Sequence, residues 1–185
     1  EYTRDSLGNI TDSTTSIVEV PIVPSMTDGP LFSLMTPNGV NTTGQLTNPL
    51  AVIGTAKKNN RAAISALLAQ PEIRTLFPQE VSFKWGAKPV VDFETREVTD
   101  NYELYAIKMR RGTSKAPLEG DLVVDAQPTP DPTTGEMAVS LRMNQKGAKI
   151  WGKMTTDAFN DNQRAVAVVL DDKVVSAPSV RSAIL

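Results

Sequence analysis

Residues 165–178 read AVAVVLDDKVVSAP, in which two apolar runs rich in valine flank a pair of acids. Both alternating faces of residues 165–170 are apolar, which is typical of a central strand that is covered on both sides. Asp171 and Asp172 stand where a tight hairpin needs residues that tolerate a positive φ. The stretch therefore predicts two strands, residues 164–170 and 173–177, joined by a tight turn.

The same two acids have a second interpretation, as an acid–base pair. Such a pair needs convergent carboxylates about 5 to 9 Å apart, one of them with a raised pKa. Neighbours in a turn generally point apart and into water, so the pattern favours a corner. The chain has no histidine and no cysteine, which removes imidazole bases, thiolate nucleophiles, disulfides and the usual zinc ligands. We predict no enzyme, no catalytic residue, no metal site and no cofactor.

The two halves of the chain repeat one order of elements. After residues 137–143, which alternate as a strand, the segment 144–159 has apolar residues at helical spacing, and the hairpin follows. In the first half, strand patterns at 50–56, 81–85 and 102–109 enclose a helical pattern at 59–70. Both halves are strand, helix, strand, strand. We predict an α+β fold of two ferredoxin-like units with mixed or antiparallel sheets and helices packed on one face.

The composition divides the chain into three parts. Residues 1–29 are polar and rich in Thr and Ser, and they are interpreted as a strap or linker. Residues 30–111 form the first predicted subdomain and residues 112–185 the second, with a joint rich in Pro and Gly between them. Since the chain opens without Met and stops inside an apolar run, we interpret it as a fragment of a longer protein.

Charge and hydropathy limit the classes of partner that we expect. The formal net charge is -2, and acids and bases nearly balance beyond the first residues, so no nucleic-acid footprint is present. No apolar run approaches the length that spans a bilayer, so this fragment is not expected to be membrane-inserted. A small basic cluster suits phosphate or an acidic peptide, or is the solvated edge of a strand. Its members are Lys108, Arg110, Arg111 and Lys115.

Three apolar side chains are candidates for peptide contact. Trp151 and Met154 share one face of the predicted helix and could line a groove, because Met and aromatic side chains make adaptable contacts. Packing of both onto the sheet is the alternative. Trp85 ends a predicted strand beside Gly86, where we expect it to be half exposed.

Two segments of the second half resemble the large extracytoplasmic domain of SecD, or of the fused SecDF protein, in the bacterial protein-export machinery. They are PLEGDLVVDAQPTPDPTTGEMAVSLRMNQKGAKIWGKMT (117–155) and NQRAVAVVLDDKVVSAPSVRSAI (162–184). The resemblance depends on the order of Ala126, Val139, Gly147-Ala148, Trp151, Thr155, Leu170-Asp171 and Val175-Ser176-Ala177-Pro178. Residues 30–111 look like an added segment of some fused SecDF proteins. Asp172 departs from the family, which usually has glycine there.

The resemblance implies a periplasmic domain of a protein of the bacterial inner (plasma) membrane. It further implies contact with unfolded preprotein during export assisted by the proton gradient, and partnership with the Sec translocon membrane subunits through the parent protein. It assigns no catalytic residue to this chain. The alternative is a structural or scaffolding domain of a cell-envelope complex, which binds a folded partner through a sheet edge. An unfolded test protein separates the two, because only the first should bind it.

Overall fold

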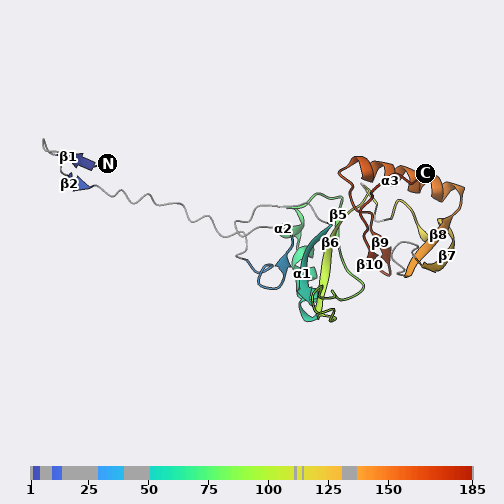
Figure 1. The fold of residues 1–185 in the computed structure, drawn as a ribbon, viewed down its shortest axis with the longest axis horizontal. Coiled ribbons are helices and arrows are strands. Elements are labelled where there is room, and N and C mark those ends of the chain that lie inside the picture. Colours follow the sequence, from blue (N-terminus) through green and yellow to red (C-terminus); the bar gives the residue numbers. More distant parts are fainter. Residues whose placement is uncertain are drawn as a thin grey trace.

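The computed structural model describes residues 2–4, 10–13, 29–39, 51–110, 112–113, 115–130 and 137–184 (Figure 1). Strands β1 (Tyr2–Arg4) and β2 (Ile10–Ser13) pair antiparallel within the segment predicted as a strap. The possible edge strand at residues 17–24 and the loop at 131–136 lie outside the described residues. The other elements form two units, one on either side of residues 109–119.

The first unit is built on a four-stranded sheet. Its strands, in spatial order, are β3 (Thr36–Pro37), β4 (Val52–Lys57), β6 (Asn101–Lys108) and β5 (Val81–Trp85). Every neighbouring pair is antiparallel, so β4 and β5 run parallel with β6 between them. The connection from β4 to β5 contains a 3-10 turn (Lys58–Asn60), α1 (Arg61–Ala69) and α2 (Pro71–Arg74).

Helix α1 covers one face of this sheet. Ile64 and Leu68, one turn apart, are buried on the same side of the helix. They pack on residues that alternate along the strands, together with Met35 from the segment before β3. The core residues are Met35, Ala56, Ile64, Leu68, Trp85 and Leu104. The first unit therefore has a hydrophobic core of its own.

The second unit contains one long helix and two hairpins. Its elements are a 3-10 turn (Gly120–Leu122), β7 (Val123–Pro130), β8 (Met137–Met143), α3 (Gln145–Asn160), β9 (Val168–Leu170) and β10 (Lys173–Ser176). Asn144 caps α3, because its side-chain oxygen accepts a hydrogen bond from the Gly147 N–H at 2.8 Å. Thr155 is fully buried, and its hydroxyl accepts from the Ile184 N–H at 3.0 Å, which holds the last described residues against α3.

The prediction for residues 164–170 is wrong in extent and in burial. Strand β9 contains only Val168–Leu170, pairs with β10 alone, and leaves Leu170 63% exposed. Ala165 instead forms an isolated antiparallel bridge with Ser179. Apolar residues on both faces favour a strand. Burial of both faces also requires further strands or helices that pack on them, and the described residues supply none over Leu170.

The α+β class with antiparallel sheets is confirmed. Each unit contains the predicted order of strand, helix, strand, strand, as β4–α1–β5–β6 and as β8–α3–β9–β10. The ferredoxin-like arrangement is not confirmed, because β7–β8 and β9–β10 form separate two-stranded sheets. The helix of the first unit does lie on one face of its sheet, as expected.

Candidate functional site

The two acids of the hairpin form its turn. Asp171 and Asp172 have φ angles of 48° and 64°, and they connect Leu170 directly to its cross-strand partner Lys173. Two successive positive φ angles are the requirement of a type I′ hairpin turn, so the interpretation as a corner is confirmed. Both acids are exposed, and the arrangement offers no enclosed pair of carboxylates.

Asp172 also connects the two units. Its carboxylate forms an ion pair with the Lys84 ammonium group on β5. Two residues further along each strand, Gly86 and Val174 form a parallel bridge, and the Ala87 N–H donates to the Val174 carbonyl at 2.8 Å. Val174 is buried there. The hairpin β9–β10 thus meets the first sheet through one isolated bridge, just beyond the end of β5.

The turn geometry leads to a stability prediction. Asp171→Val should lower the free energy of unfolding by about 1 kcal/mol, because a β-branched residue is strained at positive φ. Asp171→Gly, which suits this φ, should leave it unchanged or raise it. Urea titration followed by circular dichroism measures both variants. Equal losses for Val and Gly would contradict a role in turn geometry.

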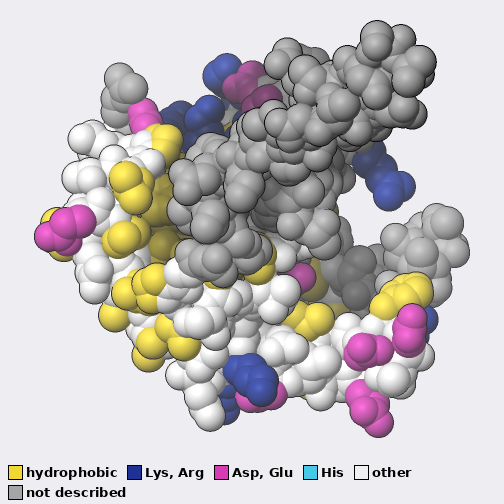
Figure 2. Space-filling view, turned by 90° about the vertical axis from the view of Figure 1, so that its left-hand side faces the viewer, with side chains coloured by type: hydrophobic (Ala, Val, Ile, Leu, Met, Phe, Trp, Pro, Cys, Tyr) yellow, Lys and Arg dark blue, Asp and Glu magenta, His cyan; other side chains and the backbone are white. Residues whose placement is uncertain are grey.

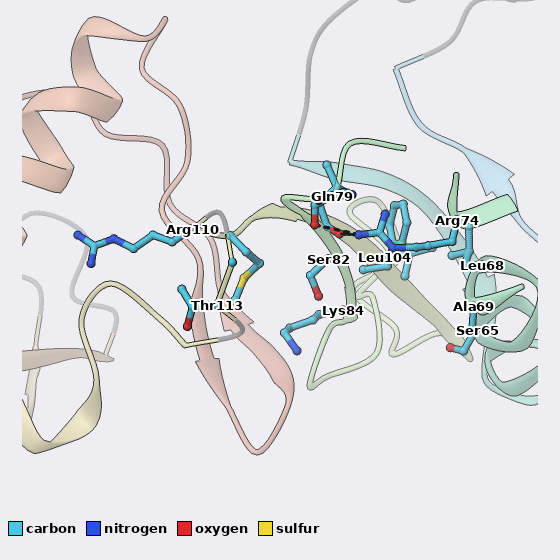
Figure 3. Close-up of a pocket in the computed structure, with 14 residues that line it drawn as sticks. Ser65, Leu68, Ala69, Arg74, Gln79, Ser82, Lys84, Leu104, Arg110 and Thr113 are labelled. Atoms are coloured by element: carbon cyan, nitrogen blue, oxygen red, sulfur yellow. Dashed lines mark hydrogen bonds between the residues drawn. The ribbon is translucent and has the colours of Figure 1, made fainter. Parts of the chain in front are cut away.

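A cavity of about 710 Å³ lies beside β5 (Figure 3). Its wall on one side comes from α1, and on the other from the segment that follows β6. The lining residues are Ser65, Leu68, Ala69, Arg74, Gln79, Val81, Ser82, Phe83, Lys84, Leu104, Met109, Arg110, Gly112 and Thr113. The volume is in the range of ligand-binding pockets.

The hairpin β7–β8 carries an exposed apolar face. Ala126 pairs with Leu141, and Pro128 pairs with Val139, so the four side chains lie on one side of the ladder. Val139 is 67% exposed and Leu141 is 44% exposed. The intervening residues Asp125, Gln127, Ser140 and Arg142 are polar. We name the set Ala126, Pro128, Val139 and Leu141 the apolar hairpin face.

The expected half exposure of Trp85 is wrong. Its side chain belongs to the core of the first unit and only 9% of the residue is exposed. The indole Nε1–H donates to the Ser65 hydroxyl of α1 at 2.9 Å, and the Arg61 guanidinium lies 5.1 Å from the ring centre. The sequence placed Trp85 at the end of a strand but gave no sign that α1 reaches over that end.

Trp151 and Met154 are half-buried on α3. They lie one turn apart, as the spacing predicted, and neither lines the cavity beside β5. The structure therefore does not bring the three candidate contact residues together. Whether any of them contacts a peptide stays a prediction.

The basic cluster is dispersed. Lys108 is exposed at the end of β6, and Arg110 lines the cavity. The Lys115 Nζ atom lies 3.9 Å from Oε1 of Glu119 in an exposed ion pair. Arg111 lies outside the described residues. On the part of the face in Figure 2 that is not grey, Lys and Arg side chains lie near Asp and Glu side chains, with uncharged surface between these groups.

Buried polar groups in the first unit serve the structure. Burial raises the pKa of the Tyr105 hydroxyl, and the hydrogen bond to the Glu103 carboxylate, at 2.5 Å, raises it further. Tyr105 therefore stays protonated and donates to Glu103.

Within the described residues, no three acidic side chains gather as they would around a metal ion, and no helix is long and apolar enough to cross a membrane.

Residues 97–185 match the family described as SecDF, P1 head subdomain. This segment belongs to the SecDF P1 head family. The P1 head match contains β6 of the first unit and the whole of the second unit, with the apolar hairpin face and the Asp171–Asp172 turn. The resemblance inferred from the sequence is confirmed.

Curated relatives support the same family. The subunit named protein translocase subunit SecD of Rhodothermus marinus is 28% identical over 162 residues, which are 87% of this chain and 23% of the relative. The subunit of the same name from Rhodobacter capsulatus is 42% identical over 63 residues, 34% of this chain and 11% of the relative. The chain thus spans less than a quarter of the length of either relative. No solved structure is detectably similar to it.

Proposed function

We propose that this chain is the extracytoplasmic part of a SecD-type subunit of the bacterial inner membrane and contacts preprotein during Sec-dependent export. The observation that carries the proposal is the apolar hairpin face, which lies exposed within the P1 head. The chain acts by binding and not by bond chemistry. The proton gradient and the contacts with the translocon membrane subunits would act through the parent protein.

An exposed apolar face suits an unfolded client. A chain that emerges from a channel exposes apolar side chains of any sequence, and burying them against Val139 and Leu141 removes apolar area from water. A contact made through apolar area alone selects weakly among sequences, which a general export factor requires. Exposed apolar patches on otherwise polar domains commonly mark such contact sites.

We propose that the two units move relative to each other. We propose residues 30–111 and 112–185 as the subdomains, with residues 1–29 as the strap. Outside the chain connection, the units meet through β5 and β10, with the Lys84–Asp172 ion pair exposed on one side. A small, partly polar interface of this kind permits relative motion more readily than a large apolar one.

A charge placed on the apolar hairpin face tests the proposal. Val139→Asp should weaken binding of a reduced, unfolded test protein about tenfold, because a carboxylate must be desolvated in an apolar contact. Fluorescence anisotropy with the labelled unfolded protein measures the dissociation constant. Ser140→Asp is the matched control, because it adds the same charge to the next residue, on the opposite face.

Equal weakening by the two variants would indicate a charge effect and contradict the assigned face. No binding by the unchanged chain at high micromolar concentration would contradict contact with unfolded polypeptide.

A second function, docking of a folded partner, is favoured by one loop. Phe93 is 83% exposed at the tip of the hairpin closed by the Val91–Val98 bridge. The Asp92 carboxylate accepts from the Thr95 N–H at 2.8 Å and the Glu94 N–H at 3.0 Å, and these bonds lower the pKa of Asp92. A preorganised aromatic tip loses little entropy when it enters a pocket. This function predicts no binding of the unfolded protein.

A further inference from the structure

Strand β5 is the edge strand of the first sheet. It pairs with β6 along its whole length, while β10 meets its other side only at Gly86. The Gly86 N–H donates to Glu103 at 2.8 Å and the Met109 N–H donates to Glu80 at 2.6 Å. Since backbone groups of a strand alternate in direction, the even-numbered residues of β5 bond to β6, and Phe83 directs its N–H and carbonyl to the open edge.

The cavity follows this edge. Its lining includes Val81 and Phe83 from one face of the strand and Ser82 and Lys84 from the other. Successive side chains of a strand point to opposite faces, so a cavity lined by all four must run along the edge itself. Figure 3 shows Ser65, Leu68 and Ala69 of α1 on one side of this space and Arg110 and Thr113 on the other.

The open part of the edge is short. At one end the Arg74 guanidinium donates to the Val81 carbonyl at 2.8 Å, and at the other the Ala87 N–H is bonded to Val174. Among the described residues, neither the N–H nor the carbonyl of Phe83 has a hydrogen-bond partner on the open side. At about 3.3 Å per residue, the gap accommodates an extended segment of about three residues.

The charges of the lining favour an acidic occupant. It contains three cations and no carboxylate. Arg74 is engaged by backbone carbonyl groups and Lys84 by Asp172. Arg110 is exposed and has no ion-pair partner in the part of the chain that is described. Figure 3 shows the Arg110 side chain extending away from the labelled side chains of β5 and α1, so a carboxylate would meet this unpaired guanidinium group beyond the part of the segment that pairs with Phe83.

We propose that the β5 edge binds a short, extended polypeptide segment that carries an acidic side chain. The segment adds to β5 as a strand, exchanges hydrogen bonds with the N–H and carbonyl of Phe83, and places its carboxylate beside Arg110. The inference rests on the proposed function in that the ligand is polypeptide. It assigns a second contact site, separate from the apolar hairpin face. This site recognises backbone hydrogen-bonding groups and charge instead of apolar side chains.

A synthetic peptide tests the inference. The probe is a short fluorescent peptide of alternating valine and threonine that ends in two glutamates, and its binding to the full 185-residue chain is measured by anisotropy. Arg110→Glu should weaken binding about tenfold through like-charge repulsion. The matched control is Lys88→Glu, an exposed cation outside the lining, which should change binding less than twofold.

Two further measurements isolate the backbone contact. The bound peptide should slow hydrogen exchange of the Phe83 amide, and the same peptide N-methylated at alternate residues should lose that protection. Binding that leaves Phe83 unprotected, or equal effects of Arg110→Glu and Lys88→Glu, would overturn the inference, as would absence of binding.

The outcome is separable from that of the proposed function. Weaker binding of the unfolded protein by Val139→Asp, together with a peptide that leaves Phe83 unprotected, would refute the β5 site alone. Protection of Phe83 by the peptide, with no effect of Val139→Asp on the unfolded protein, would refute the apolar face alone.

Discussion

Replacing Leu104 by alanine is expected to lower the free energy of unfolding of the first unit by about 3 kcal/mol, within the usual range for a buried leucine. Leu104 is 1% exposed on β6, the strand that lies between β4 and β5. Its cross-strand partners are Gly54 and Trp85. Alanine would leave a cavity among residues that the sheet holds in place, so little relaxation is available to fill it.

Urea denaturation followed by Trp85 fluorescence measures this loss, with Trp151 replaced by phenylalanine so that only the first unit reports. The control is Leu76→Ala, the same change at a 75% exposed site in the first unit, which should cost about 0.5 kcal/mol or less. Comparable losses at both positions would mean that the core is not centred on β6.

Elements whose signal is local were predicted closely. The strands predicted at 81–85 and 137–143 have the bounds of β5 and β8, and the predicted helix at 144–159 differs from α3 by one residue at each end. Periodicity of two or of 3.6 residues depends only on neighbours in the sequence. The positive φ of the turn at Asp171 and Asp172 was predictable for the same reason.

Features that depend on distant pairing were not predictable. The burial of residues 165–170 was overestimated, because apolar residues on both faces do not show which strand lies beside this segment. The Lys84–Asp172 ion pair joins residues 88 positions apart, and the sequence around either gives no sign of the other. The burial of Trp85 depends on where α1 crosses the sheet, which is a property of packing.

The candidate site was likewise predicted only in part. The apolar hairpin face is visible in the sequence as alternation over residues 124–128 and 137–141, and that signal was available. The cavity beside β5 was not, because it arises where a sheet edge, α1 and the segment after β6 come together. Arg110 was predicted as a member of a basic cluster. In the structure it is one of the residues that line the cavity beside the β5 edge.

Gly147→Val is expected to destabilise the second unit by about 3 kcal/mol, near the upper end for overpacking. A Cβ at Gly147 would lie 3.0 Å from the Leu122 carbonyl oxygen and 3.1 Å from the Cβ atoms of Leu122 and Met143. These atoms lie on or next to the backbone and cannot rotate away. The branched side chain of valine would therefore separate α3 from β8 at the helix start, where Asn144 caps the helix.

Ala148→Val separates this clash from the intrinsic cost of valine in a helix. Ala148 is the next residue of α3 and is exposed, so its replacement should cost only about 0.6 kcal/mol of helix propensity. Urea denaturation followed by Trp151 fluorescence, with Trp85 replaced by phenylalanine, compares the two variants. Because the apolar hairpin face includes residues of β8, Gly147→Val should also weaken binding of the unfolded test protein, whereas Ala148→Val should not. Equal stability of the two variants would mean that α3 does not approach Leu122 as closely as described.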